Sequence, residues 1–199
     1  MKTFKEFNNI NENHNFTNEA NIGLKGVTSF RNGLSAEIVM EKYPWLLQAK
    51  FKNAVIGEDH LNGLILWFKG TWIDGTWENG RWCDGIWEDG VWENGAWNKG
   101  TWKSGTWKNG TWENGKWESG TWENGTWENG TWYDGTWEDG IWIKGSFRNG
   151  TWKNGTWENG DFSHGTWENG IWKRGDWYDG STYNEKTKKF EKSKAPSSI

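Results

Sequence analysis

The chain has 199 residues, of which 22 are Trp and 28 are Gly, whereas it contains only 2 Pro, 2 Met and 1 Cys. This is not an ordinary globular composition, because the indoles have to supply most of any core. With 23 basic and 27 acidic residues, the charge balance gives no electrostatic support for coating nucleic acid. Cys83 alone cannot form an internal disulfide, and His14, His60 and His164 show no metal-ligand spacing.

The first residues predict a peripheral arm. Residues 1–7 lack the apolar stretch of a secretion signal, and no run of 18 apolar residues follows anywhere, so we expect a soluble intracellular protein that does not span a membrane. Seven Asn lie within residues 8–21, with little apolar mass, which indicates a flexible segment. We assign residues 1–33 to this arm, although residues 29–33 have the same sequence as residues 146–150 and predict an isolated repeat unit.

A short helix is predicted next, within a capping and linker segment over residues 34–48. Ser35 is a suitable N-cap for a helix from Ala36 to Lys42, and the step from Tyr43 to Pro44 ends it because proline disfavours helix in the residue before it. Repeat folds need capped ends, so this helix is expected to cover the first coil of the repeat that follows.

The repeat itself has a period of five residues from Trp67 to Gly180, without insertion or deletion. Its aromatic slot recurs 23 times and holds Trp in 21 units, with Phe147 and Phe162 as the exceptions. Gly occupies its own slot in all 23 units, and Asn or Asp precedes that Gly in 16 of them. Such pairs are turn signals because Gly adopts positive φ freely and Asn or Asp tolerates it.

The three residues between turns, most often Thr-Trp-Glu, predict a short strand with Thr and Glu on one face and Trp on the other. A helix is excluded, since Gly at every fifth position would destabilise it by about 1 kcal/mol each. A meander would need 23 strands and would leave its Trp face bare, whereas open sheets rarely exceed about 10 strands. The pattern therefore favours a solenoid with the indoles inside.

The same period of five residues begins upstream, where Phe51, Ile56, Leu61 and Leu66 are evenly spaced. This resembles the pentapeptide-repeat family, which has a small residue, a polar residue, a central Leu or Phe and two variable positions. The resemblance implies a right-handed, four-sided β-helix over residues 49–180, with those four residues as the centres of a first coil. Trp with Gly would replace the usual central and small residues at roughly constant volume.

The number of sides stays open between four, preferred from the resemblance, and two or three. Buried indole N–H groups call for acceptors that a four-sided core does not readily offer. Stacking the residue after each aromatic at spacings of 10, 15 and 20 gives five, seven and five opposite-charge pairs against five, three and four like-charge pairs. The frame also slips by one residue near Leu66 and Trp67, which predicts a bulge or a coil boundary there.

The period of five ends in the tail, residues 181–199. This segment contains five Lys within residues 186–194, which predicts a basic, flexible, solvated segment. The first seven residues resemble the start of proteins from large tailed bacteriophages of the T4 type. This resemblance implies a viral origin, with the host cytoplasm or the virion as the compartment.

No residue is singled out for catalysis, cofactor binding or metal binding. Carboxylate pairs such as Asp84 with Glu88 and Asp134 with Glu138 arise from the repeat itself, and nothing places them in a cleft. Cys83 is expected to be a surface thiol rather than a nucleophile, because no His accompanies it in the neighbouring units.

The leading interpretation is a non-enzymatic structural or protein-interaction solenoid that binds a protein partner or associates with itself, without a small-molecule substrate or cofactor. One alternative comes from the family resemblance, because some pentapeptide-repeat proteins mimic DNA and bind type II topoisomerases. That alternative is a DNA-mimic inhibitor of a topoisomerase or another nucleic-acid-binding host protein. A second is an aromatic stripe that binds glycans, or a Thr column that binds ice, although Arg81, Lys116, Asp161 and Asp176 interrupt that column.

Overall fold

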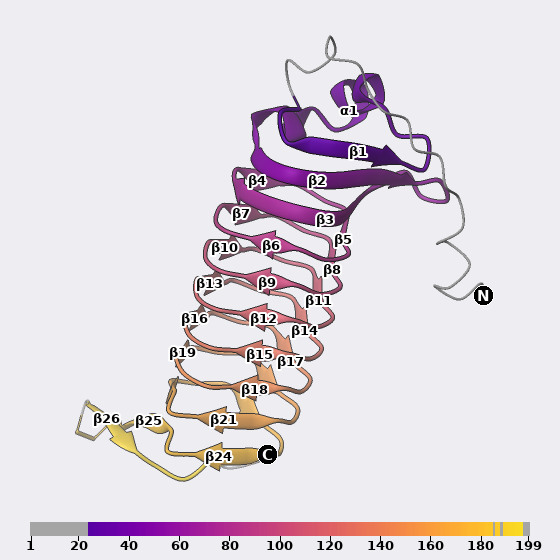
Figure 1. Ribbon diagram of the computed structural model, residues 1–199. Coiled ribbons are helices and arrows are strands. Elements are labelled where there is room, and N and C mark those ends of the chain that lie inside the picture. Colours follow the sequence, from indigo (N-terminus) through magenta and orange to yellow (C-terminus); the bar gives the residue numbers. More distant parts are fainter. Residues whose placement is uncertain (1–23, 185, 188, 197–199) are drawn as a thin grey trace.

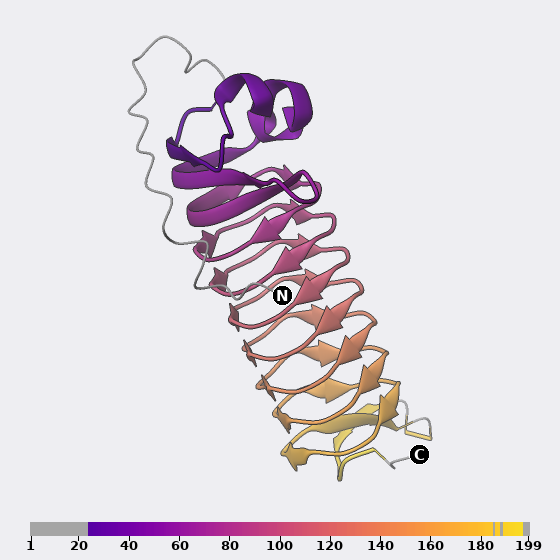
Figure 2. The same ribbon diagram turned by 90° about the vertical axis from the view of Figure 1, so that its right-hand side faces the viewer.

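The computed structural model describes residues 24–184, 186–187 and 189–196. These residues form a rod with a cap at its N-terminal end and a coiled shaft below it (Figures 1 and 2). Two sheets run along the shaft, one of 17 strands that forms two faces and one of 9 strands that forms the third. The solenoid and the inward Trp face predicted from the repeat are confirmed.

The shaft has three faces, which are named here in the order in which the chain visits them. The first and second faces share the long strand β3, Leu64–Asp74, because this strand turns the first corner without a break. The first face then contains β5 (Arg81–Trp82), β8 (Ala96–Trp97), β11 (Thr111–Trp112), β14 (Thr126–Trp127), β17 (Ile141–Trp142), β20 (Thr156–Trp157) and β23 (Ile171–Trp172). The second contains β6 (Ile86–Trp87), β9 (Thr101–Trp102), β12 (Lys116–Trp117), β15 (Thr131–Trp132), β18 (Ser146–Phe147), β21 (Asp161–Ser163) and β24 (Asp176–Tyr178).

The third face is the 9-stranded sheet. It contains β4 (Thr76–Trp77), β7 (Val91–Trp92), β10 (Thr106–Trp107), β13 (Thr121–Trp122), β16 (Thr136–Trp137), β19 (Thr151–Trp152), β22 (Thr166–Trp167), β25 (Ser181–Asn184) and β26 (Lys189–Lys192). The strands of successive coils pair in parallel, whereas β26 at the C-terminal end of this sheet pairs antiparallel with β25.

Each coil contains three units of five residues, so the preference for a four-sided coil is wrong and the three-sided alternative holds. Trp107 pairs with Trp92 above it and Trp122 below it, and the same register of three units recurs along the shaft. The chain passes from the front strand β6 to β7 and then β8 before it returns one coil lower at β9, which gives a right-handed coil (Figure 1).

Three columns of stacked aromatic rings fill the interior. Neighbouring rings in a column, such as Trp107 and Trp122, lie with centroids 4.8 Å apart and planes within 5°. Rings in successive units of one coil, such as Trp107 and Trp112, meet edge to face at 6.0 Å and 74°. Nearly all of these side chains have no exposed surface, so the core is a triangular prism of indoles.

Glycine makes the sharp corners of the triangle. Gly125, for example, has a φ of +119°, and a Cβ added there would collide with the carbonyl oxygen of Gly110 in the coil above. The residue before such a Gly has a different role from the expected one, because positive φ falls on Asn or Asp in the shaft only at Asp179. In eight units its side chain instead accepts a hydrogen bond from the glycine N–H, as Asn124 does from Gly125 at 2.8 Å.

The cap is a hairpin rather than a first coil of pentads, so the assignment of residues 49–63 to the solenoid is wrong, whereas β3 belongs to both the hairpin and the shaft. Strand β2, Lys50–Asp59, pairs antiparallel with β3, and β1, Val27–Arg31, pairs parallel with β2. Leu61, predicted to be a coil centre, lies at the hairpin turn and is 89% exposed. The physical reason is local: this segment lacks the Gly corners of the repeat, and Gly63 at a φ of +64° turns the chain back.

The predicted helix is confirmed as α1, Ala36–Lys42, with Ser35 accepting a hydrogen bond from the N–H of Ile38. The 3₁₀ helix η2, Pro44–Gln48, follows directly and lies over β4, the first strand of the third face. Its Trp45 meets Trp77 edge to face at 5.1 Å and so closes the third column. The helix therefore belongs to the cap, while the covering contact comes from η2.

The described residues near both ends of the chain are more ordered than predicted. Residues 24–33 are not an arm, since Leu24 is buried and β1 joins the sheet instead of forming an isolated repeat unit. Residues 1–23, including the flexible segment expected over residues 8–21, lie outside the described residues. The tail is not simply flexible, because β25 continues the third face and the indole N–H of Trp177 donates to the carbonyl of Ser193 at 2.9 Å.

Candidate interaction surfaces

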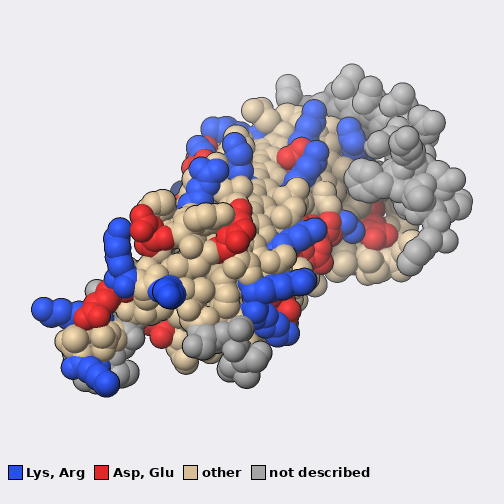
Figure 3. Space-filling model, turned by 90° about the horizontal axis from the view of Figure 1, so that it is seen from below, with Lys and Arg blue, Asp and Glu red and all other residues tan. Residues whose placement is uncertain are grey.

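The three faces differ in charge. Over residues 67–180, with each turn counted with the strand before it, the first face has six basic and four acidic residues, the second three and eight, and the third two and six. The net charges are therefore +2, −5 and −4. Seen from below, acidic and basic side chains are interspersed among broad uncharged areas, so the surface in view carries no continuous acidic stripe (Figure 3).

Ion pairs tie neighbouring coils together along each face. Lys108 reaches Glu93 at 3.0 Å and Lys153 reaches Glu138 at 2.9 Å, and each pair joins two adjacent coils. The carboxylates noted as pairs in the sequence are engaged in the same way: Lys99 and Lys103 lie 3.2 and 3.9 Å from Asp84 and Glu88. Asp134 accepts from the N–H of Gly135 at 2.7 Å. These carboxylates act in the ladder and in the turns, and the structure does not bring them together in a cleft.

Residues suited to catalysis or metal binding are scattered. Cys83 is a free thiol that is half-buried rather than fully on the surface, and burial raises the pKa of this thiol, which disfavours the reactive thiolate. His60 lies near the cap hairpin and His164 in a turn of the second face, whereas His14 lies outside the described residues. Within the described ranges, no group of three His, Cys, Asp or Glu is arranged to hold a metal ion.

The alternative of an exposed aromatic stripe is wrong. Every shaft Trp from Trp67 to Trp157 is fully buried, so stacking of glycans on these indoles is ruled out. The Thr column, by contrast, is more continuous than the sequence suggested, because the four interrupting residues lie on the first two faces. The third-face column reads Thr76, Val91, Thr106, Thr121, Thr136, Thr151, Thr166 and Ser181. A parallel column of Glu and Lys lies beside it and keeps this face hydrated, which disfavours ice binding.

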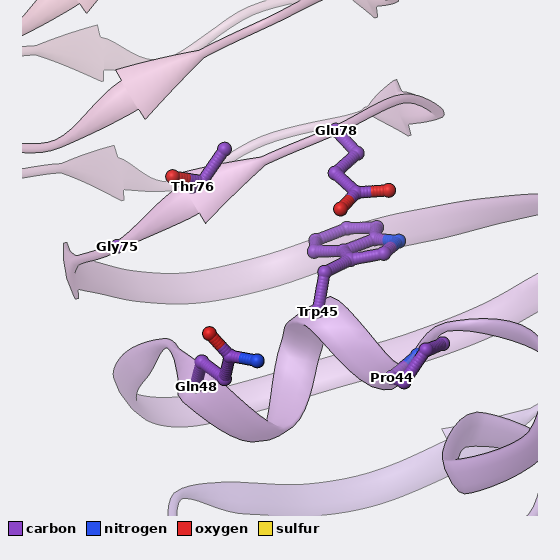
Figure 4. Close-up of a pocket in the computed structure, with 6 residues that line it drawn as sticks. All are labelled: Pro44, Trp45, Gln48, Gly75, Thr76 and Glu78. Atoms are coloured by element: carbon purple, nitrogen blue, oxygen red, sulfur yellow. The ribbon is translucent and has the colours of Figure 1, made fainter.

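A hollow of 390 Å³ lies where the cap meets the third face. Trp45 rises into it from η2, Gln48 approaches from the same helix, and Glu78 and Thr76 reach it from the β4 side (Figure 4). One indole, one carboxylate and one amide do not form an acid–base pair, since such a pair needs two ionisable side chains and Glu78 is the only one in this lining.

A second hollow, of 340 Å³, lies on the first face near the C-terminal end. Its lining consists of the exposed side chains of Ile141 and Ile143, the cations Lys144 and Arg174, and Glu158 with Asn159. The carboxylate of Glu158 is paired with Lys173 at 2.8 Å. This hollow was not predicted from the sequence, although residues 141–144 read Ile-Trp-Ile-Lys where the repeat favours Thr-Trp-Glu-Asn.

Glu58 is the one buried acidic or basic residue in the part of the chain that the structure describes, and sequence reasoning also missed it. Its carboxylate accepts from the Lys42 ammonium at 2.9 Å and from the Tyr43 hydroxyl at 2.9 Å. The hydrogen bond from Lys42 lowers the pKa of Glu58, while burial acts in the opposite direction. Burial, followed by the contact with Glu58, raises the pKa of Tyr43. This cluster joins α1 to the hairpin and is a structural element of the cap.

No family model, curated protein or solved structure matches this chain. The resemblance to pentapeptide repeats therefore rests on the residues alone, and the coil of three units departs from the four-sided coil that it implied. None of the helices among the described residues has the length and apolar character needed to cross a membrane.

Proposed function

We propose that this protein is a non-enzymatic rigid rod that holds a bound protein at a fixed distance and orientation from its capped end. The observation that carries the proposal is the set of three aromatic columns, which run without a break from the cap to the last coil. A core made of planar rings in contact on every side cannot bend without losing stacking. Its outer surface is a ladder of ion pairs and turns, which suits a spacer.

Coil insertion tests the rod. Because all three faces share one consensus, duplication of residues 106–120 should add one coil and lengthen the shaft by about 4.8 Å, the separation of stacked rings. Duplication of residues 106–110 alone should turn everything below it by one third of a coil.

Spin labels provide the measurement. Cysteines replacing Leu61 and Tyr178, in a Cys83→Ser background, place one exposed label at each end of the rod. A narrow distance distribution that shifts by about one strand spacing of 4.7–4.9 Å when a whole coil is duplicated supports the proposal. A broad distribution, or a duplication that leaves the distance unchanged, contradicts it.

A DNA-mimic inhibitor is the second candidate, and the segregation of acidic residues on the second and third faces favours it. It predicts that the protein inhibits DNA supercoiling by a type II topoisomerase at stoichiometric concentration. Full enzyme activity at a large excess of the protein would remove this candidate. A bacteriophage origin is a further proposal, supported by the resemblance of residues 1–7.

A further inference from the structure

The first face carries a patch that the fold does not require. Ile141 and Ile143, which are 45% and 39% exposed, line the hollow of 340 Å³. Ile171, which is 41% exposed, lies two coils below Ile141 on the same face. The core beneath them is complete without them, because Trp142 and Trp172 are buried as in every other coil. Exposed apolar clusters on a soluble surface mark interaction sites.

The residues of the patch also differ from the repeat consensus, since apolar side chains replace polar ones. On the same face Thr126 and Thr156 occupy the slot of Ile141, and Glu128 and Glu158 occupy the slot of Ile143. The coils directly above and below therefore carry polar residues in the slots of these two isoleucines. Their replacement here is a local feature of these coils and not a property of the repeat.

Two cations complete the patch. Lys144 and Arg174 take the turn slot that holds Asn or Asp in 16 of the 23 units, and neither cation can accept a hydrogen bond from the glycine N–H as Asn124 does from Gly125. Neither side chain has an ion-pair partner among the described residues, whereas nearby Lys173 reaches Glu158 at 2.8 Å. The two cations lie two coils apart on the same face, and the stacked rings beneath them are separated by 4.9 Å and then 5.1 Å.

We propose that this isoleucine patch binds an extended acidic segment of a partner protein. An aliphatic side chain of the segment fills the hollow, and two carboxylates pair with Lys144 and Arg174. In an extended polyproline-type chain, residues three apart share one side and lie about 9 Å apart, which matches the rise of two coils between the cations. The inference rests on the proposed rod, since it names the place where the rod holds its partner.

Charge selects this face over the others. The second and third faces have net charges of −5 and −4 and repel an acidic segment, whereas the first face has +2 and attracts it. An acidic partner is therefore oriented on the rod by repulsion as well as by contact.

A labelled peptide tests the site. The probe is a fluorescein-labelled peptide of three Glu-Val-Pro repeats, with a Lys-Val-Pro peptide as its matched control, and binding is followed by fluorescence anisotropy with the full chain. We expect saturable binding of the acidic probe that weakens as salt is added. Absence of saturable binding up to about 1 mM, or equal binding of the basic probe, overturns the proposal.

The repeat offers a variant that should keep its fold. The triple change Ile141→Thr, Ile143→Glu and Lys144→Asn restores the consensus unit and should weaken binding at least tenfold without lowering the melting temperature. Arg174→Asn should weaken it severalfold, while the control Lys153→Asn on the third face should leave it unchanged. Unchanged binding by the triple variant refutes the site. Loss of a self-association of the rod in that variant would show that the patch holds a second copy, which also overturns the proposal.

These results are separable from those of the rod. The distance measurement between spin labels does not depend on the patch, so a failed peptide experiment with a narrow label distribution rejects the site and keeps the rod.

Discussion

At the scale of the residue, the indole N–H is the unusual group. Seventeen of these N–H groups are buried without a hydrogen-bond partner, which would cost about 1–3 kcal/mol each in an apolar surround. The edge-to-face contacts between successive indoles direct ring edges at neighbouring π faces, and such contacts offset part of that cost. Where Phe147 replaces an indole below Trp132, the Trp132 N–H instead donates to the carbonyl of Asn149 at 3.1 Å.

Trp127→Ala should destabilise the protein by about 3–5 kcal/mol through lost burial and a cavity. The ring stacks on Trp112 at 4.8 Å and on Trp142 at 4.7 Å, so its removal interrupts a column in mid-shaft. Chemical denaturation measures the change, with Thr126→Ala as the surface control, which should stay within about 1 kcal/mol. A variant as stable as the parent would contradict the closed aromatic core.

Gly125→Val should destabilise the shaft by at least about 3 kcal/mol, because the new side chain both overpacks and requires a strained φ. The clash is with the backbone of Gly110 in the coil above, which cannot move without opening the ladder. The melting temperature is the readout, and Glu128→Gln on the surface should leave it unchanged. Equal melting of the Val variant would mean that the corner is not where we place it.

At the scale of the element, the cap and the coils differ in how their backbone groups are hydrogen-bonded. A coil is held by two backbone hydrogen bonds per unit to the coil above, as when Thr106 donates to Gly90 at 2.9 Å and Lys108 to Trp92 at 2.8 Å. The first coil has no coil above it, and β2 together with η2 supplies the missing contacts. Solenoids need such covered ends to remain soluble and separate.

The cap should lose stability in acid through Glu58. Lys42 lowers the pKa of this carboxyl in the folded state, so ionised Glu58 stabilises the cap above its unfolded pKa of about 4.3. That contribution disappears as the pH falls through the lower folded pKa. Hydrogen exchange of residues 24–74, measured between pH 3 and pH 6 and corrected for intrinsic rates, should show the cap opening in acid.

Glu58→Gln provides the comparison for that experiment. The amide cannot ionise, so the cap of this variant should open to a similar extent across the same pH range. If parent and variant show the same pH dependence, another group controls the cap.

At the scale of the whole molecule, stability should fall from the middle of the shaft toward its C-terminal end. Interior coils contact two neighbours, whereas the last coil is bounded by β26 on the third face and by the segment around Ser193. Hydrogen exchange should therefore be slowest near residues 110–140 and faster over residues 165–184. A uniform rate along the shaft would indicate all-or-none opening of the rod.

Much of this architecture could be predicted from local chemistry, and the coil size could not. The Gly corners, the inward Trp and the helix capped by Ser35 follow from spacing and propensity. Trp with Gly conserves volume per unit, but volume per unit does not fix how many units close a coil. The corner angle does, and the positive φ of the corner glycines permits a triangle. At a spacing of 15 residues, which corresponds to three units per coil, seven opposite-charge pairs stood against three like-charge pairs. This count favoured the coil that the structure shows, but it was too small to outweigh the family resemblance.

The cap and the isoleucine patch were harder to predict for opposite reasons. Residues 49–66 keep a spacing of five while forming a hairpin. Phe51 and Ile56 are both buried although they lie five residues apart, because the pairing of β2 shifts register between them, whereas Leu61 lies exposed at the turn. The patch departs from the consensus at Ile141 and Ile143, but its neighbours in space lie one or two whole coils further along the chain. Ile171 and Arg174 join the patch only once the coil length is known.

The stacked columns also give the molecule a distinctive response to ultraviolet light. Parallel indoles 4.8 Å apart share their excited states, so an absorbed photon is delocalised over several rings instead of residing on one. The folded shaft should therefore show a strong exciton couplet in circular dichroism near the main indole absorption band, and its emission should be depolarised by transfer along the columns. Both signals vanish when the rings separate, which makes the core its own spectroscopic probe of coil integrity.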